Sequence, residues 1–214
     1  MNKEVYILSG LGADKRVFKN INLTGYNVTH LEWIQPMHDE PVEAYATRIR
    51  AGIHAPLPVL IGLSFGGIMA IEIAKQMPVE KVIIISSVKK KNEIPWYMRW
   101  AGTLRLHKII PASMLKKPRP LLYWLFGTYT QSDQAQLQQI LHDTDNSFLR
   151  WAMDVIVHWK QRNTLPGICH IHGTHDRIFP YRYMHCHHTI KGGGHFMVLD
   201  KAVEVTRILQ EELG

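Results

Sequence analysis

Apolar residues follow two spacings that alternate from one segment of the chain to the next. Short, nearly continuous apolar runs predict strands at 3–8, 28–33, 59–61, 81–88, 168–172 and 189–190, because a strand buried on both faces is apolar at most positions. Helical spacing predicts a short helix after Asp14 and longer helices at 41–54, 66–77 and 201–212. Strands that alternate with helices favour a mostly parallel sheet with helices on both faces.

Residues 89–162 break this alternation. Their spacing is helical throughout, and helices are predicted near 95–107, 120–127, 132–142 and 146–161. Five of the six tryptophans lie in this segment. We therefore expect a core domain made of residues 1–88 and 163–214, with a helical insertion at 89–162.

The length and composition are those expected of a globular protein. A chain of 214 residues fits one domain with an insertion, and no apolar run approaches the roughly 18 residues that a membrane span needs. The first apolar run leads into a glycine-rich turn, which is typical of a first strand and not of a signal peptide. The two cysteines, Cys169 and Cys186, cannot form a disulfide framework, so we expect a cytoplasmic protein in which both fill strand or loop positions.

The sequence Gly62-Leu63-Ser64-Phe65-Gly66 joins a predicted strand to a predicted helix. A serine at the apex of such a sharp turn is raised above the sheet, and a side chain at either glycine position would collide with neighbouring backbone. The helix that follows points its positive end at the serine. The pattern predicts a catalytic nucleophile, with a passive serine in a glycine-rich turn as the alternative.

A base and an acid follow the serine along the chain. A serine hydroxyl becomes a nucleophile when a histidine takes its proton, and a carboxylate then orients the histidine. Asp176 and His195 both follow predicted strands, as do Ser64 and residues 10–14. Since the carboxyl ends of parallel strands meet at one sheet edge, these residues should converge there.

With the order Ser64, Asp176, His195, the chain resembles the α/β-hydrolase superfamily over nearly its whole length. The resemblance implies an α/β-hydrolase fold that begins at the family's third strand, and a helical cap at 89–162. It also implies an oxyanion hole formed by the backbone amides of Leu11 and Phe65. Gly12 or Ala13 could serve in place of Leu11.

The residue at the turn indicates the reaction class. A haloalkane dehalogenase of this fold would carry Asp where this chain carries Ser64, so acyl transfer to water is favoured. We expect a serine carboxylesterase or thioesterase that acts on a small apolar acyl substrate through an acyl-enzyme, without a cofactor. The alternatives are an inactive hydrolase-fold binding protein and a cofactor-free C–C hydrolase or lyase with the same triad.

A histidine-rich stretch offers a metal alternative. His170, His172 and His175 resemble the zinc motif of metallo-β-lactamase-like hydrolases, but Thr174 stands where that motif has aspartate. No matching ligands follow downstream, and the first two histidines lie in an apolar strand pattern. We therefore expect no catalytic metal.

The predicted insertion carries aromatic residues and positive charge. Trp96, Trp100 and Trp124 are the residues predicted to bind an apolar acyl group, although most aromatic side chains here should simply pack the insertion onto the core. Residues 89–162 hold twelve Lys and Arg against five Asp and Glu, which accounts for the whole net charge of +7. No nucleic-acid motif accompanies this charge, so an anionic carrier or surface is the predicted partner, with a solvated face as the alternative.

Overall fold

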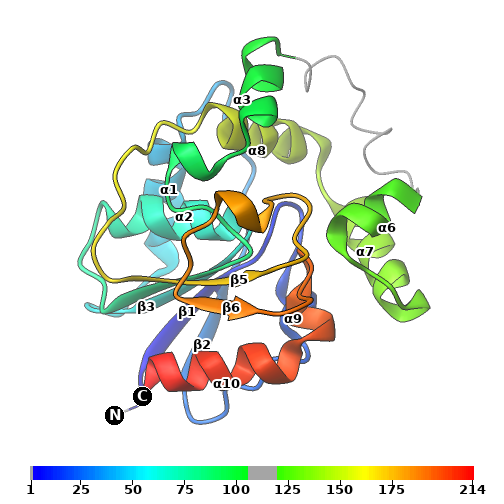
Figure 1. The fold of residues 1–214 in the computed structure, drawn as a ribbon. Coiled ribbons are helices and arrows are strands. Elements are labelled where there is room, and N and C mark those ends of the chain that lie inside the picture. Colours follow the sequence, from blue (N-terminus) through cyan, green and yellow to red (C-terminus); the bar gives the residue numbers. More distant parts are fainter. Residues whose placement is uncertain (1, 106–119) are drawn as a thin grey trace.

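The computed structural model of the chain describes residues 2–105 and 120–214. Six strands form one sheet in the order β2-β1-β3-β4-β5-β6, and every neighbouring pair is parallel. The strands are β1 (Glu4–Leu8), β2 (Asn27–Leu31), β3 (Val59–Leu63), β4 (Lys81–Ile85), β5 (Ile168–Gly173) and β6 (His188–Ile190). The predicted parallel sheet is therefore confirmed, and Figure 1 shows it in the centre of the molecule.

Eight α-helices surround the sheet in the described part of the chain (Figure 1). They are α1 (Val42–Ile49), α2 (Phe65–Ala74), α3 (Trp96–Thr103), α6 (Pro120–Phe126), α7 (Gln131–Asp143), α8 (Asn146–His158), α9 (Met197–Asp200) and α10 (Ala202–Leu213). Short 3-10 turns occur at Lys15–Phe18, Arg50–Gly52, Lys91–Glu93 and Tyr181–Tyr183. None of the described helices combines the length and apolar composition needed to cross a membrane.

Most predicted elements begin close to their expected bounds, but β4 and several helices end early. It was predicted to reach residue 88 but ends at Ile85, because Ser86 adopts a φ of 48° that an extended strand cannot accommodate. The helices predicted at 41–54, 95–107 and 146–161 also end earlier, at Ile49, Thr103 and His158.

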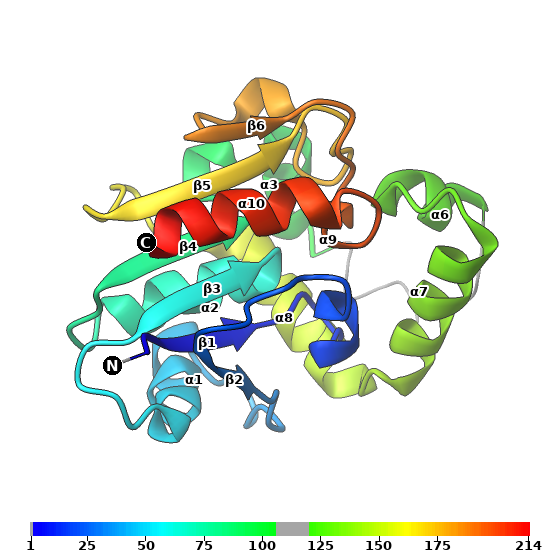
Figure 2. The ribbon, with the colours of Figure 1, turned by 90° about the horizontal axis from the view of Figure 1, so that it is seen from below.

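Two hydrophobic clusters lie on opposite faces of the sheet. Along β4, Ile83 and Ile85 belong to one cluster while Val82 and Ile84 belong to the other, as the two-residue period of a strand requires. Helix α10 covers the first face, and α1, α2 and α8 cover the second (Figures 1 and 2). Both faces are covered by helices, which explains why the strands read as continuous apolar runs.

The helices between β4 and β5 contribute to both clusters. Leu137 and Ile140 of α7 join the cluster beneath α10, and Phe148 and Ile156 of α8 join the cluster around α2. Helix α8 also packs against α3. The segment predicted to be an insertion is thus partly built into the core.

The strand order places the chain's reversal point between β1 and β3. From β1 the chain passes to β2 on one side and then returns to β3 on the other. In open parallel sheets, ligands bind beyond the carboxyl ends of the strands at such a point. Strands β1 and β3 lie side by side here (Figure 2), and residue 9 and Ser64 directly follow their carboxyl ends.

Strand β5 buries two histidines completely. The ring nitrogens His170 Nε2 and His172 Nδ1 are 3.2 Å apart, and His172 Nε2 donates to the carbonyl of Phe179 at 2.8 Å. Burial lowers the pKa of both imidazoles, that of His170 well below 6.5, and the proximity of His172 adds to the shift in His170. Both rings are therefore neutral in the folded chain near neutral pH.

These histidines should make the fold sensitive to acid. In the unfolded chain they bind protons below about pH 6.5, whereas the folded chain does not, so their stability contribution is complete above that pH and falls below it. Each should add a slope of up to about 1.4 kcal/mol per pH unit to the free energy of unfolding. The free energy of unfolding, measured with urea at pH values from 7.5 to 5.5, should depend less steeply on pH for His170→Asn than for the parent. The exposed control His38→Asn should keep the parent slope, and equal slopes in all three would refute this account.

Candidate active site

The turn between β3 and α2 holds Ser64 in a strained conformation, with φ 52° and ψ −117°. A Cβ added to Gly66 would lie 2.2 Å from the carbonyl oxygen of Leu8, and one added to Gly62 would lie 2.3 Å from the carbonyl oxygen of Gly66. The Ser64 amide donates to the carbonyl of Ile85 at 2.8 Å. The two glycines are thus required because backbone segments approach closely on both sides of the serine.

His195 lies near the end of the loop that joins β6 to α9. A Cβ on Gly173 would lie 2.2 Å from the carbonyl oxygen of Gly193, so this loop packs directly against the end of β5. The His195 side chain is buried, and its Nε2 lies 2.9 Å from Ser64 Oγ. This is the distance that a base needs to take the hydroxyl proton.

Asp176 completes the hydrogen-bonded chain. His195 Nδ1 lies 2.9 Å from Asp176 Oδ2, and the amides of Ile178 and Phe179 donate to Asp176 Oδ1 at 2.9 and 2.8 Å. The carboxylate is therefore held on both oxygens. With the imidazole proton on Nδ1 facing the carboxylate, Nε2 is free to accept the proton of Ser64.

A second buried histidine lies behind the acid. His172 Nε2 is 3.6 Å from Asp176 Oδ2 and donates to the carbonyl of Phe179, so it fixes the turn that presents the aspartate. Asp176 opposes the loss of the His172 proton, but burial is the larger effect and lowers the pKa. The sequence points to His172 only as part of a metal motif, because a histidine inside an apolar strand otherwise resembles a core residue.

The metal motif considered from the sequence does not converge. His170 and His172 are buried and bonded to each other, while His175 is exposed. His172 Nε2 donates to a backbone carbonyl, so the lone pair of this ring is on Nδ1, which faces His170 Nε2. His172 therefore offers no nitrogen to an ion shared with His175.

Two loops lie beside the serine where an oxyanion would form. Phe65 is the first residue of α2, and a Cβ on Gly10 would lie 3.5 Å from the Ser64 Cβ. Among the described residues, the amides of Leu11, Gly12 and Phe65 have no protein acceptor, whereas the Ala13 amide donates to the carbonyl of Gly10 at 3.0 Å. Ala13 is therefore excluded as a donor to a substrate oxygen.

Aromatic rings enclose His195. The rings of Phe126 and Phe179 lie edge-on to the imidazole with centroids 5.6 and 5.7 Å away, and Phe196 stacks at 6.2 Å. Gly127, which follows α6, packs against the loop that carries His195, since a Cβ on Gly127 would lie 3.0 Å from Gly194 Cα. These neighbours were not predicted as site residues, because only the packing of α6 on the loop brings Phe126 there.

The three predicted substrate-binding tryptophans lie on the outer surface. Trp96 and Trp100 of α3 and Trp124 of α6 each expose more than half of their surface. The guanidinium of Arg177 lies over the Trp124 ring, with its carbon 4.5 Å from the ring centre. Arg177 also donates to the backbone carbonyl of Trp124 at 2.7 Å. Because Arg177 follows Asp176 directly, Trp124 lies beside the turn that carries the acid.

A groove of about 680 Å³ lies between the loop that precedes α1 and helix α8. Its walls include Glu40, Trp151 and Trp159. None of the three triad residues lines it, so we do not assign the catalytic chemistry to this groove.

Comparisons with known proteins identify the fold and the family. A family model described as the alpha/beta hydrolase family matches residues 8–208. Among solved structures, a lipase-esterase related protein from Clostridium acetobutylicum superposes with a TM-score of 0.70 at 17% identity, covering 98% of this chain and 93% of that one. An enol-lactonase from Burkholderia xenovorans gives 0.69 at 15% identity, with 100% and 92% covered.

A third structure, a thermophilic esterase from Thermogutta terrifontis, superposes with a TM-score of 0.67 at 16% identity, covering 100% of this chain and 90% of that one. No curated protein sequence matches significantly. At these identities the solved structures establish the fold, and the family model covers more than nine-tenths of the sequence. The chain therefore belongs to the alpha/beta hydrolase family.

Proposed function

We propose that the chain hydrolyses carboxylic esters or thioesters, with Ser64 as nucleophile, His195 as base and Asp176 as the acid that orients it. The observation that carries this proposal is the unbroken hydrogen-bonded chain from Ser64 Oγ through His195 to Asp176, with 2.9 Å at both contacts. All three side chains are buried, so water does not compete for these bonds.

The proposed reaction proceeds in two halves. Ser64 Oγ attacks the acyl carbon while His195 Nε2 takes its proton, and the tetrahedral intermediate expels the alcohol or thiol with that proton. Water then attacks the acyl-enzyme, gives a proton to His195, and releases the acid as the proton returns to Ser64. The amides of Phe65 and Leu11 would hold the oxyanion, each contributing about 3–4 kcal/mol.

The surroundings of the base support an apolar acyl group. Phe126 and Phe179 border His195, and Phe65 joins a cluster with Trp33, Phe148 and Trp151. Such rings bind hydrocarbon better than charged groups. Of the three solved structures compared above, one is described as an esterase, one as a lipase-esterase related protein and one as an enol-lactonase, which also favours ester chemistry.

Replacement of the nucleophile gives the first test. Ser64→Ala should lower kcat for a p-nitrophenyl ester by about 10⁶-fold, because the acyl-enzyme can no longer form. The fold should persist, since the serine is at a turn apex. The exposed control Ser132→Ala should keep parent activity, and an active Ser64→Ala enzyme would refute the assignment.

The acid gives an independent test. Asp176→Asn preserves the shape of the side chain but favours the wrong imidazole tautomer, so kcat should fall about 10⁴-fold with little change in KM. The exposed Asp39→Asn serves as the matched control. A fall of less than tenfold in Asp176→Asn would show that His195 is oriented by another group.

Two other functions remain open to experiment. A C–C hydrolase or lyase of this fold would use the same triad, so only analysis of the products separates it from an esterase. An inactive binding protein would leave Ser64 unreactive. A panel of p-nitrophenyl esters of increasing chain length distinguishes the leading proposal from an inactive binding protein and measures the acyl preference.

The basic insertion supports a further proposal, an anionic substrate or carrier near the site. Of its charges, Lys116, Lys117 and Arg119 lie outside the described residues. Lys89 is buried and bonded to the carbonyl of His185, so it serves the fold. Arg105 is exposed at the end of α3, whose Trp96, Trp100 and Leu104 form an exposed apolar stripe.

If the basic residues attract an anion, screening should weaken the encounter. We expect kcat/KM for a phosphate-bearing thioester to fall as salt rises, while kcat/KM for a neutral short ester stays constant. At low salt, Arg105→Glu should lower the ratio of kcat/KM for the thioester to kcat/KM for the neutral ester. The control Lys19→Glu, which changes an exposed lysine outside the insertion, should leave this ratio unchanged. Equal ratios in parent and Arg105→Glu would show that Arg105 is only a solvated charge.

A further inference from the structure

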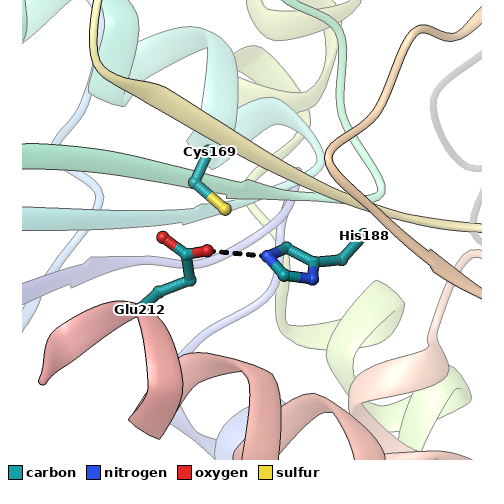
Figure 3. A group of neighbouring side chains, drawn as sticks. All are labelled: Cys169, His188 and Glu212. Carbon is teal, nitrogen blue, oxygen red and sulfur yellow. Dashed lines mark hydrogen bonds and ion pairs between the residues drawn. The ribbon is translucent and has the colours of Figure 1, made fainter.

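A group of three potential metal ligands lies between the sheet and the last turn of α10. Figure 3 shows Cys169 of β5, His188 of β6 and Glu212 of α10 pointing toward one another. One donor atom from each, a sulfur, a ring nitrogen and a carboxylate oxygen, lies within 4.8 Å of the other two. Within the described part of the chain, no other group of three or more His, Cys, Asp or Glu side chains meets this limit.

The carboxylate is already oriented by its neighbours. Lys81 Nζ donates to Glu212 Oε2 at 2.9 Å and to the Glu212 carbonyl at 2.6 Å. Glu212 Oε1 faces His188 Nε2 at 2.7 Å (Figure 3). Lys81 thus occupies one carboxylate oxygen and leaves the other directed at the imidazole, in the way that outer hydrogen bonds fix the ligands of metal sites.

We propose that Cys169, His188 and Glu212 bind a zinc ion that ties α10 to β5 and β6. Thiolate, imidazole and carboxylate are the three protein ligands of zinc, and a tetrahedral site places its ligand atoms about 3.5 Å apart. His188 Nε2 and Glu212 Oε1 are closer than this, at 2.7 Å, so these two side chains need to part slightly, and the Cys169 sulfur lies within 4.8 Å of both. His188 and Glu212 are partly exposed, which lets water take the fourth position.

The protons balance in a simple way. In the metal-free chain, burial raises the pKa of Cys169 to about 12, so the thiol keeps its proton. Zinc binding releases that proton to water, and His188 binds the metal through Nε2 with its remaining ring proton on Nδ1. Zinc with one thiolate and one carboxylate is neutral overall, and Lys81 stays paired with Glu212 Oε2.

The site is separate from the proposed catalytic centre. Cys169 and His188 lie at the amino ends of their strands, whereas Ser64, Asp176 and His195 lie at the carboxyl edge of the sheet. Cys169 also belongs to the cluster beneath α10, on the face opposite His170 and His172. The metal would therefore stabilise the C-terminal helix and take no part in catalysis.

Cobalt titration tests the proposal, because Co²⁺ occupies zinc sites and shows a thiolate charge-transfer band in the near ultraviolet when cysteine is a ligand. The chain is produced without a polyhistidine tag and freed of metal with a chelator. The parent should show the band at one equivalent of Co²⁺ and lose it when Zn²⁺ is added. Cys169→Ser should lack the band and His188→Gln should bind cobalt more than about 100-fold more weakly, beyond the loss expected for an outer partner.

The control is Cys186→Ser, which removes the other cysteine and should keep the parent band and affinity. Zn²⁺ should also raise the midpoint of thermal unfolding of the parent and of Cys186→Ser, but not of Cys169→Ser. Circular dichroism establishes that each variant is folded before titration. Absence of a thiolate band in the folded parent, or a band that persists in Cys169→Ser, would overturn the proposal and leave the group as a tie between side chains alone.

Discussion

The close approach of three backbone segments at Ser64 is the constraint on which the site depends. Strand β3 pairs with both β1 and β4, and the turn after it fits only because Gly66 lets α2 approach the carbonyl of Leu8. The positive φ of Ser64 costs about 1–3 kcal/mol, which the surrounding apolar packing offsets. In return, the hydroxyl lies above the sheet edge, within hydrogen-bond distance of His195.

The remaining parts of the site are positioned by the same sheet. Parallel strands end at one edge, so the loops after β5 and β6 bring Asp176 and His195 to the serine although they are far apart along the chain. Behind them, His172 and the amides of Ile178 and Phe179 hold the acid turn in place. Groups fixed before substrate arrives need little rearrangement during the reaction.

The sequence predicted those features that local pattern determines. Glycines around a serine, a Gly-to-Asp turn and a glycine-rich loop before a histidine each have a local physical reason, and the strand order then brings them together. Phe126, His172 and the group formed by Cys169 with His188 could not be predicted. Their roles depend on how α6, β5 and α10 pack, and periodicity shows only that such residues are buried or exposed. Aromatic content likewise does not reveal which face of a helix is exposed, and the three predicted tryptophans are each more than half exposed.

The central claim is that Ser64 is an activated nucleophile, and the most direct test is covalent labelling. The chain should be treated with a fluorophosphonate and the modified peptide identified by mass spectrometry. The account predicts one adduct, on Ser64, that forms in the folded chain but not in a chain denatured before treatment, since the free hydroxyl is unreactive without His195. A folded chain that takes up no label, or takes it up at another residue, would contradict the account.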